Sequence, residues 1–433
     1  MASRMRQIGL ILVVAAAVAA CGGGSKKAAS PASSSAAPTT SSSSSSSSSG
    51  GALPEGVFEV TDPSSGDPAL FGQNVSVTTT KAGDPVVAFA VKDASGDRSG
   101  IFVSAFDSTK KAFAPQVQVA SASLHAESQS ISIATDQASG TLVMVWDDGD
   151  KKIMASQSTD NGKSWHTAAV VDGSDATHSG HSPSIGAANG KVAIAFVDGN
   201  AVPMLAAGSL DSTDFTTLEI GPSPDGATPT NAVPAVAVDS SGSFAAAYIA
   251  APPAGGVVAE FIADGGTAVP AIDSKGVQND SPSVGLAFGP SGPIVGATIC
   301  NVDNENDACT FTAVSTDGGA TFGTPVSVPA DTGTGGGFVT RVAADGKSAV
   351  AFSYISNTGN GTAKCGEPKI SLSTDLGKTW QTCSPDADGS SGFGSGVPAL
   401  AVAPDRSLVL AFQQSSTSAK APTGILVGVI PPH

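Results

Sequence analysis

Two kinds of apolar segment alternate along the chain after residue 52. In the first kind, apolar residues alternate with small polar residues, as in Gln73–Val77, and in the second they are denser, as in Val192–Phe196. A turn containing Gly or Asp joins the two. Alternation with a period of two predicts β-strands, and a short turn between two such strands predicts an antiparallel hairpin. The hairpin recurs at intervals of 48 to 58 residues, starting at Gln73, Gln129, Pro183, Pro234, Pro282, Thr340 and Pro398.

A second motif lies between these hairpins. Three segments share the pattern S-x-D-x-G-x-[ST]-[WF], and degraded copies occur near Asp107, Asp211 and Asp264. In such a turn, the carboxylate and the hydroxyls can hydrogen-bond to backbone amides, and Gly can adopt a positive φ. The pattern resembles the Asp-box of sialidase-like, BNR-repeat β-propellers. We predict a structural role for its residues, which are Ser158, Asp160, Gly162, Trp165, Ser315, Asp317, Gly319, Phe322, Ser373, Asp375, Gly377 and Trp380.

This resemblance implies an all-β fold, a β-propeller of four-stranded antiparallel blades, with each motif aromatic in the gap between two blades. Seven repeats over residues 53–433 would have about 54 residues each, close to the observed spacing. We therefore expect seven blades, with six as the alternative. Ile425–Ile430 reads as the third strand of the last blade, and Val57–Val60 resembles a fourth strand. We expect Val57–Val60 to close the ring, because closure removes open strand edges.

The first 52 residues have a different composition. Arg4 and Arg6 precede a short apolar run, and the following Val18–Cys21 resembles a bacterial lipobox, in which the cysteine is lipidated. We predict a lipoprotein signal peptide at 1–20 and a lipidated Cys21. We expect residues 21–52 to form a Ser-rich, disordered linker that tethers the propeller at 53–433, because this segment has almost nothing to bury. The protein would then be extracytoplasmic and anchored to the bacterial cell membrane.

Charge narrows the range of partners. The chain has 21 Lys and Arg against 37 Asp and Glu, a formal net charge of −16. Such an acidic chain is a poor partner for nucleic acid or for an anionic membrane surface, so we expect the membrane contact to be the lipid anchor alone. With only 13% charged residues, the chain is also unlike a charged disordered protein.

Four further cysteines lie in the exported part of the chain. Cys300 and Cys309 flank a short loop, and Cys365 and Cys383 bracket the third Asp-box hairpin. An oxidising compartment favours two disulfides. Four cysteines can pair in three ways, and we expect the local pairing, Cys300 with Cys309 and Cys365 with Cys383. A zinc site with four cysteine ligands is the alternative, but C-x-x-C spacing is missing from the sequence.

The resemblance also implies where catalysis would occur. In sialidases the active face carries an arginine triad, a Tyr nucleophile paired with Glu, and an Asp acid/base, whereas the Asp-boxes lie on the other face. We expect only Arg98 and Arg341 to reach that face, because Arg406 lies in a turn on the other side. Tyr248 and Tyr354 each end a second strand and read as packed residues. We therefore predict no catalytic residues, and name Arg341, Tyr354 and Arg98 as those to test if the protein is an enzyme.

No resident metal or cofactor is predicted. Asp303, Glu305 and Asp307 alternate oxygen ligands and are weak calcium candidates, although the loop lacks the central Gly and distal Glu of an EF-hand. A weaker candidate is a zinc site formed by two loops at equivalent positions in successive repeats. One loop would contribute Asp175, His178 and His181, and the loop one repeat earlier would contribute His125 and Glu127.

Taken together, these features predict a membrane-anchored, extracytoplasmic propeller that acts as a monomeric binding module for a protein or glycan. The alternative is a sialidase-like glycoside hydrolase that uses the loop face of the propeller.

Overall fold

The computed structural model describes residues 56–60, 75–92, 99–121, 131–148, 152–166, 169–172, 181–197, 202–210, 212, 214–220, 227–230, 232–253, 258–273, 283–299, 310–328, 341–344, 350–356, 367–383, 398–414 and 424–431. The chain divides into two compact units, Met1–Ser49 and Gly50–His433, and every described residue belongs to the second. Its secondary structure is entirely β-strand over these ranges. Over the same ranges, no helix has the length and apolarity needed to cross a membrane.

The described strands form seven antiparallel sheets, numbered here in chain order. Sheet 1 contains β2 (Val75–Thr79), β3 (Pro85–Lys92), β4 (Ser99–Asp107), β5 (Ala112–Phe113) and β6 (Val117–Ser121). Sheet 2 contains β7 (Ile131–Asp136), β8 (Thr141–Asp147), β9 (Ile153–Ser158) and β10 (Ala169–Asp172). Sheet 3 contains β11 (His181–Ala188), β12 (Lys191–Val197), β13 (Pro203–Ser209) and β14 (Thr216–Glu219).

Sheet 4 contains β15 (Thr228–Pro229), β16 (Ala235–Val238), β17 (Phe244–Ala251), β18 (Val258–Ala263) and β19 (Val269–Asp273). Sheet 5 contains β20 (Ser283–Gly289), β21 (Gly292–Thr298), β22 (Thr310–Val314) and β23 (Val326–Ser327). Sheet 6 contains β24 (Arg341–Ala344), β25 (Val350–Ser356), β26 (Glu367–Ser373) and β27 (Gln381–Cys383). Sheet 7 contains β28 (Ala399–Val402), β29 (Leu408–Gln414), β30 (Gly424–Ile430) and β1 (Val57–Glu59).

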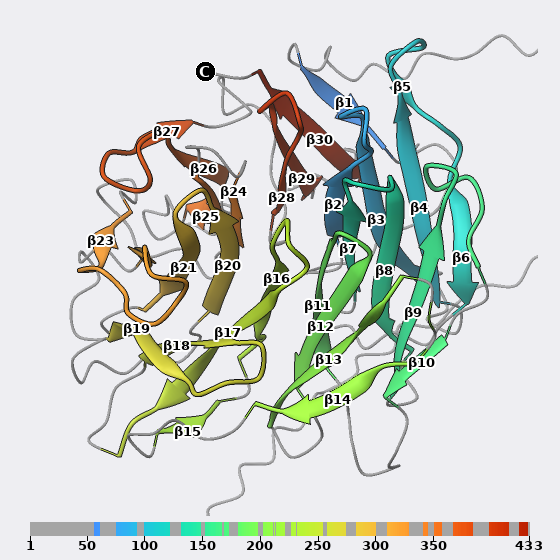
Figure 1. The fold of residues 1–433 in the computed structure, drawn as a ribbon. Coiled ribbons are helices and arrows are strands. Elements are labelled where there is room, and N and C mark those ends of the chain that lie inside the picture. The colour runs from blue at the N-terminus through green and yellow to red at the C-terminus, as the bar shows by residue number, and fades with distance from the viewer. Residues whose placement is uncertain are drawn as a thin grey trace, which may run out of the picture. The chain divides into compact units, whose positions relative to one another are not determined.

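The innermost strands of these sheets contact one another in a closed order. β2 contacts β7, the contacts continue through β11, β16, β20, β24 and β28, and β28 contacts β2 again. In Figure 1 the colour therefore passes around the unit from blue to red until β28–β30 lie beside β2 and β3. Four-stranded antiparallel sheets in this arrangement define a β-propeller, which confirms the all-β architecture expected from the sequence.

The last sheet joins the two ends of this unit. β1 pairs antiparallel with β30, with Val57 opposite Gly428 and Glu59 opposite Leu426, as the strand pattern of Val57–Val60 predicts. Val57 and Val60 are buried, and the Phe58 ring lies edge-on against the ring of Phe106 in sheet 1. β1 therefore contributes side chains to the core as well as covering the edge of β30.

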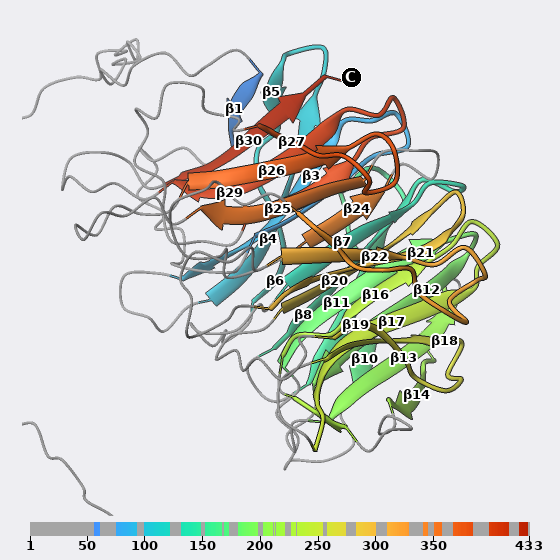
Figure 2. The same ribbon diagram turned by 90° about the vertical axis from the view of Figure 1, so that its left-hand side faces the viewer.

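The two ends of the strands define two faces. We call the end with the connections between first and second strands and between third and fourth strands the turn face, and the opposite end the loop face. Figure 2 shows the sheets from the side, with strands of different sheets running in similar directions and the hairpin turns together on the right.

Packing between sheets follows the alternation along each innermost strand. Ile131 and Ile133 of β7 face the preceding sheet and join a cluster with its Val86 and Ile101. Positions on the opposite side are small: a Cβ added to Gly285 of β20 would lie 2.6 Å from a Val342 side-chain carbon in the next sheet. Large residues on one side and small residues on the other allow the innermost strands to approach closely.

Polar contacts also join neighbouring sheets along the turn face. Lys81 Nζ donates to Ala138 O at 2.6 Å, from sheet 1 to sheet 2. The buried Asp136 carboxylate accepts the N–H groups of Asn189 and Gly190 at 3.0 and 3.2 Å, from sheet 3. Burial raises the pKa of Asp136, but hydrogen bonds led by that from Ser139 outweigh it and hold the pKa below its ordinary value. These contacts fix the order and spacing of the first three sheets.

Candidate ligand-binding site at the central channel

Three turns with the same sequence pattern lie on the turn face; we call residues 158–165, 315–322 and 373–380 the repeated turns. In each, the Ser hydroxyl donates to Asp Oδ1 at 2.8 Å and accepts the N–H of the Gly at 2.7–2.9 Å. The hydroxyl of the seventh residue donates to Asp Oδ2 at 2.6–2.7 Å, and its N–H donates to Oδ1 at 2.8–2.9 Å. One carboxylate thus organises the whole turn.

The aromatic residue of each repeated turn packs toward the preceding sheet. Trp165 joins the cluster between sheets 1 and 2, and Trp380 joins the cluster that contains Ile294 of sheet 5. Phe322 packs against Phe261 of sheet 4, with ring centroids 5.3 Å apart. These turns therefore stabilise the contact between neighbouring sheets. Their Ser, Asp and Thr side chains form hydrogen bonds within the turn itself.

Hydrogen bonding lowers the pKa of all three turn carboxyls. The pKa of Asp160, Asp317 and Asp375 falls from 3.8 to about 2, and the largest cause in each case is the hydroxyl donor at the seventh residue. A folded-state pKa below the unfolded value means that the ionised carboxylate favours the folded state. This contribution is complete above pH 4 and is lost as the pH falls toward 2.

We therefore expect the unfolding temperature to decrease as the pH is lowered from about 4 to about 2, because the three carboxylates become protonated. A variant with Asp160→Asn, Asp317→Asn and Asp375→Asn should have a lower unfolding temperature at pH 6 and a weaker dependence on pH in this window. Asp214→Asn, at an exposed carboxyl in the turn of sheet 3, is the control. Parallel curves for wild type and the triple variant would contradict the assignment.

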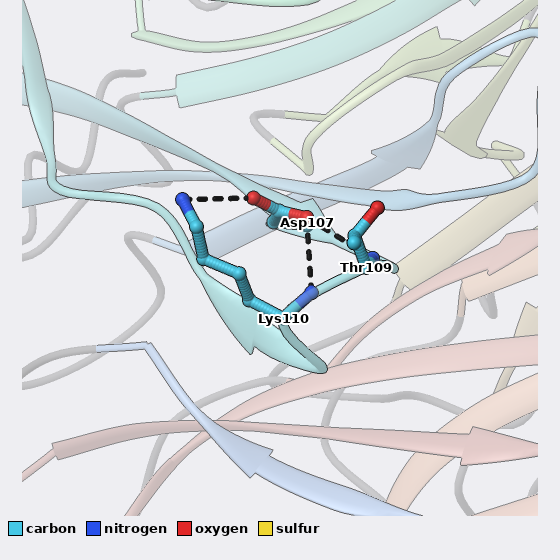
Figure 3. Close-up of polar contacts among 3 residues, drawn as sticks. All are labelled: Asp107, Thr109 and Lys110. Atoms are coloured by element: carbon cyan, nitrogen blue, oxygen red, sulfur yellow. Dashed lines mark hydrogen bonds and ion pairs between the residues drawn. The ribbon is translucent and has the colours of Figure 1, made fainter.

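The turn at the equivalent position in sheet 1 is stabilised by a different set of residues around Asp107. Asp107 Oδ1 accepts the N–H groups of Thr109 and Lys110 at 3.0 and 3.1 Å, and Lys110 Nζ lies 3.1 Å from Asp107 Oδ2 (Figure 3). The Lys110 side chain is the largest cause of a lowered pKa at Asp107. An ammonium here contacts the carboxylate oxygen that a hydroxyl contacts in the repeated turns, which explains how this degraded copy can still form the turn.

A cavity of about 150 Å³ lies at the centre of the ring. Residues in or next to all seven innermost strands line it, and most of them are Val, Ile, Leu, Ala or Pro. The polar side chains in this lining are Ser76, Ser132, Ser184 and Arg341. All four lie on the first halves of their strands, which run from the loop face to the turn face. The cavity therefore lies in the loop-face half of the ring.

Two of these serines join neighbouring innermost strands. Ser76 Oγ accepts the N–H of Ile133 at 3.1 Å, and Ser184 Oγ donates to Pro234 O at 2.9 Å. Both hydroxyls are held in place by these bonds and keep capacity for a further hydrogen bond, because a hydroxyl has one donor and two acceptor sites. The lining is thus preorganised for a ligand that carries polar groups.

Arg341 is the charged residue of this cavity. It is the first residue of β24, opposite Ser353, at the loop-face end of the strand. Burial lowers the pKa of its guanidinium to about 10, so the group remains protonated at neutral pH in a site with reduced access to water. A partly desolvated guanidinium is a strong donor to carboxylate, sulfate or phosphate oxygens. The role of Arg341 at the loop face stays a prediction.

A buried polar pair lies elsewhere, between sheets 3 and 4. Tyr248 Oη donates to Glu260 Oε2 at 2.6 Å, and both residues have 0% relative exposure. This confirms that Tyr248 is a packed strand residue, but the sequence analysis missed Glu260. The sequence nevertheless contained a signal for this residue. Val258, Glu260 and Ile262 lie on one side of β18, and Glu260 is the charged residue between two apolar ones. Both side chains are fully buried, and neither lines the central cavity.

Many residues singled out from the sequence lie outside the described part of the chain. They are Cys21, Arg98, His125, Glu127, Asp175, His178, Cys300, Asp303, Glu305, Asp307, Cys309 and Cys365. His181, Tyr354 and Cys383 are described by backbone alone, in β11, β25 and β27. Within the described ranges, no group of three or more His, Cys, Asp or Glu side chains is placed to hold a metal ion. The disulfide and calcium assignments remain predictions.

Known structures share this fold at low sequence identity. No family model matches the chain, and no curated protein matches it. The crystal structure of polysaccharide lyase Uly1 aligns with a TM-score of 0.53 and 7% identity, over 84% of this chain and 90% of that chain. The Hadza microbial sialidase Hz136 aligns with a TM-score of 0.47 and 15% identity, over 85% of this chain and 66% of that chain.

A sialidase from Trypanosoma rangeli, in complex with the inhibitor DANA, has a TM-score of 0.47 and 13% identity, over 84% of this chain and 59% of that chain. The chain thus spans less than two thirds of either sialidase chain. The similarity to the lyase concerns the fold and agrees with a β-propeller.

Proposed function

We propose that this chain is a lipid-anchored, extracytoplasmic, seven-bladed β-propeller that binds a glycan or protein ligand through its loop face. Seven sheets whose innermost strands contact one another in a closed order support the blade count over six. The Asp-box reading of the repeated turns is supported by their shared hydrogen-bond pattern. The anchor rests on the lipobox-like Val18–Cys21.

One observation carries the binding proposal. The central cavity is lined by Arg341, whose guanidinium is partly desolvated, and by Ser76, Ser132 and Ser184. A guanidinium can make two parallel hydrogen bonds to an acidic group, and hydroxyls pair well with sugar hydroxyls or amides. An acidic sugar or an acidic side chain fits this donor set. A volume of about 150 Å³ accepts one such group rather than a whole oligomer.

The test is a glycan array followed by affinity measurement with the best ligand. Arg341→Gln should weaken binding at least tenfold, because charge-assisted hydrogen bonds contribute about 1.5–3 kcal/mol. Arg406→Gln is the matched control, since Arg406 lies in a turn on the opposite face. Equal affinity of wild type and Arg341→Gln would exclude the cavity as the binding site.

The hydrolase alternative makes a different prediction. We expect no turnover of a fluorogenic sialoside by the purified protein above a blank, because the donor set at the cavity holds one arginine rather than a triad over the described residues. Turnover that is abolished by Arg341→Lys would replace the binding module with an enzyme. Tyr354, on the strand paired with β24, would then be the nucleophile to test, with Arg98 as a further candidate.

Membrane attachment is tested separately. Cys21→Ser should abolish metabolic lipid labelling and move the protein from the membrane to the soluble fraction, because the lipidated residue would be lost. Ser25→Ala, four residues further along the linker, is the control and should remain in the membrane fraction. Unchanged membrane fractionation of Cys21→Ser would overturn the lipoprotein assignment.

A further inference from the structure

Two turns of the described chain contain an Asn–Gly pair followed by a lysine, Asn161–Gly162 and Asn189–Gly190. The first pair forms the fourth and fifth residues of the first repeated turn, and the second joins β11 to β12. All four residues have a positive φ, between 49° and 85°, and both asparagines are exposed. Asn–Gly pairs are chemically labile, because Gly has no Cβ to obstruct attack of its nitrogen on the preceding side chain. The two pairs thus share a local sequence and differ in their surroundings.

Three hydrogen bonds hold the Asn189–Gly190 pair. The N–H groups of Asn189 and Gly190 donate to the Asp136 carboxylate at 3.0 and 3.2 Å, and Asn189 Nδ2 donates to Ser241 O of sheet 4 at 3.1 Å. Burial raises the pKa of Asp136, but hydrogen bonds outweigh it, so the carboxylate is ionised at neutral pH. Removing the Gly190 proton would place a negative nitrogen beside a negative oxygen. The Asn189 side chain would also have to break its bond to Ser241.

The surroundings of Asn161 and Gly162 are different. The N–H of Gly162 donates to Ser158 Oγ at 2.9 Å, and that hydroxyl donates to Asp160 Oδ1 at 2.8 Å. The acceptor next to the Gly162 nitrogen is therefore a neutral hydroxyl. Within the part of the chain that the structure describes, the Asn161 side chain makes no hydrogen bond. The exposed amide can therefore rotate toward the Gly162 nitrogen without breaking one.

We propose that Asn161 is a site of non-enzymatic deamidation in the folded protein and that Asn189, with the same local sequence, is protected. In the first step the Gly162 nitrogen attacks Asn161 Cγ. The new N–C bond replaces the Cγ–Nδ2 bond, and the Gly162 proton leaves with the departing nitrogen as ammonia. Water then adds to either carbonyl of the five-membered imide and opens it. The products are aspartate and isoaspartate at position 161, and the modification is independent of ligand binding.

Isoaspartate at position 161 would alter the first repeated turn. Its main chain continues through the former side-chain carbonyl, which adds one methylene to the backbone. The turn depends on fixed offsets, because Ser164 N–H and Oγ donate to Asp160 at 2.9 and 2.6 Å and Trp165 packs in the cluster between sheets 1 and 2. We therefore expect the modified chain to be less stable, through weaker packing between these two sheets.

Peptide mapping of the protein during storage at mildly alkaline pH tests the proposal. Mass spectrometry of digests follows the mass gain that accompanies replacement of the amide by a carboxyl, and an isoaspartyl methyltransferase labels the isoaspartate. Asn161→Gly is the matched control, because Gly318 occupies the same position in the second repeated turn with a φ of +76°. The same measurement in denaturant gives the intrinsic rates, which we expect to be equal because both pairs read Asn-Gly-Lys.

We expect position 161 to deamidate several-fold faster than position 189 in the folded protein. The unfolding temperature of stored wild type should fall as isoaspartate accumulates, whereas that of stored Asn161→Gly should stay constant. A ratio of the two rates in the folded protein no larger than the ratio in denaturant would overturn the proposal. So would faster deamidation at position 189 than at position 161 in the folded protein.

Discussion

Gly319→Ala should lower the free energy of unfolding by about 3–5 kcal/mol, because two costs add. Gly319 has a φ of +97°, where a residue with a Cβ is strained. An added Cβ would also overlap the ring of Phe261, a residue that is 1% exposed in the core of sheet 4. The ring cannot withdraw without disturbing its contact with Phe322, so the clash has to be absorbed by the packing between sheets 4 and 5.

Gly318→Ala separates the two costs. Gly318 also has a positive φ, +76°, but an added Cβ would meet nothing within 4 Å. We expect this variant to lose only about 1–2 kcal/mol, the cost of the backbone conformation. Chemical denaturation of both variants gives the comparison. Equal losses would mean that the repeated turn is not pressed against the preceding sheet.

Deletion of residues 53–62 should destabilise the whole propeller by on the order of 5 kcal/mol. The deletion removes Val57 and Val60 from two different core clusters and the Phe58 ring from Phe106. It also breaks the backbone hydrogen bonds that β1 makes with β30 and exposes the edge of that strand. Because β1 completes sheet 7, which contacts sheet 1, the loss affects the closure of the ring.

Deletion of residues 22–52 in the same chain is the control for shortening the N-terminus. We expect it to leave the unfolding transition unchanged, because this Ser-rich segment has few side chains that could be buried. The unfolding temperatures of the two deletion variants, measured from their melting curves, give the comparison. If both deletions behave alike, β1 contributes nothing to closure.

The strands and turns could be predicted from the sequence because their causes are local. A period of two in Ile131–Ile133 reports which side chains face a core, and a Ser, Asp and Gly at fixed offsets in 158–165 are sufficient to form a turn. Even the closure strand was visible, since Val57–Val60 has the pattern of an outer strand and the last repeat lacked one. Repetition strengthened these inferences, because the same local pattern occurs in several copies.

The candidate site was predicted less completely. Arg341 could be assigned to the loop face from its place at the start of an innermost strand, but the sequence contains no sign of its cavity. Ser76, Ser132 and Ser184 looked like ordinary strand positions, and they become a common lining only when strands about 50 residues apart converge on one axis. The Tyr248 and Glu260 pair was missed for a related reason, since its two members meet through the register of β17 and β18.

The sequence by itself therefore determined the elements of this protein: the strand pairs, the turns that carry Asp160, Asp317 and Asp375, and the strand that closes the last sheet. Each follows from hydrogen bonds and alternation within a few residues. Only the tertiary structure decided which residues surround the channel, that a Cβ at position 319 would overlap the ring of Phe261, and that β1 pairs with β30. Those properties depend on distances between residues far apart in the chain, which are set when the sheets pack against one another.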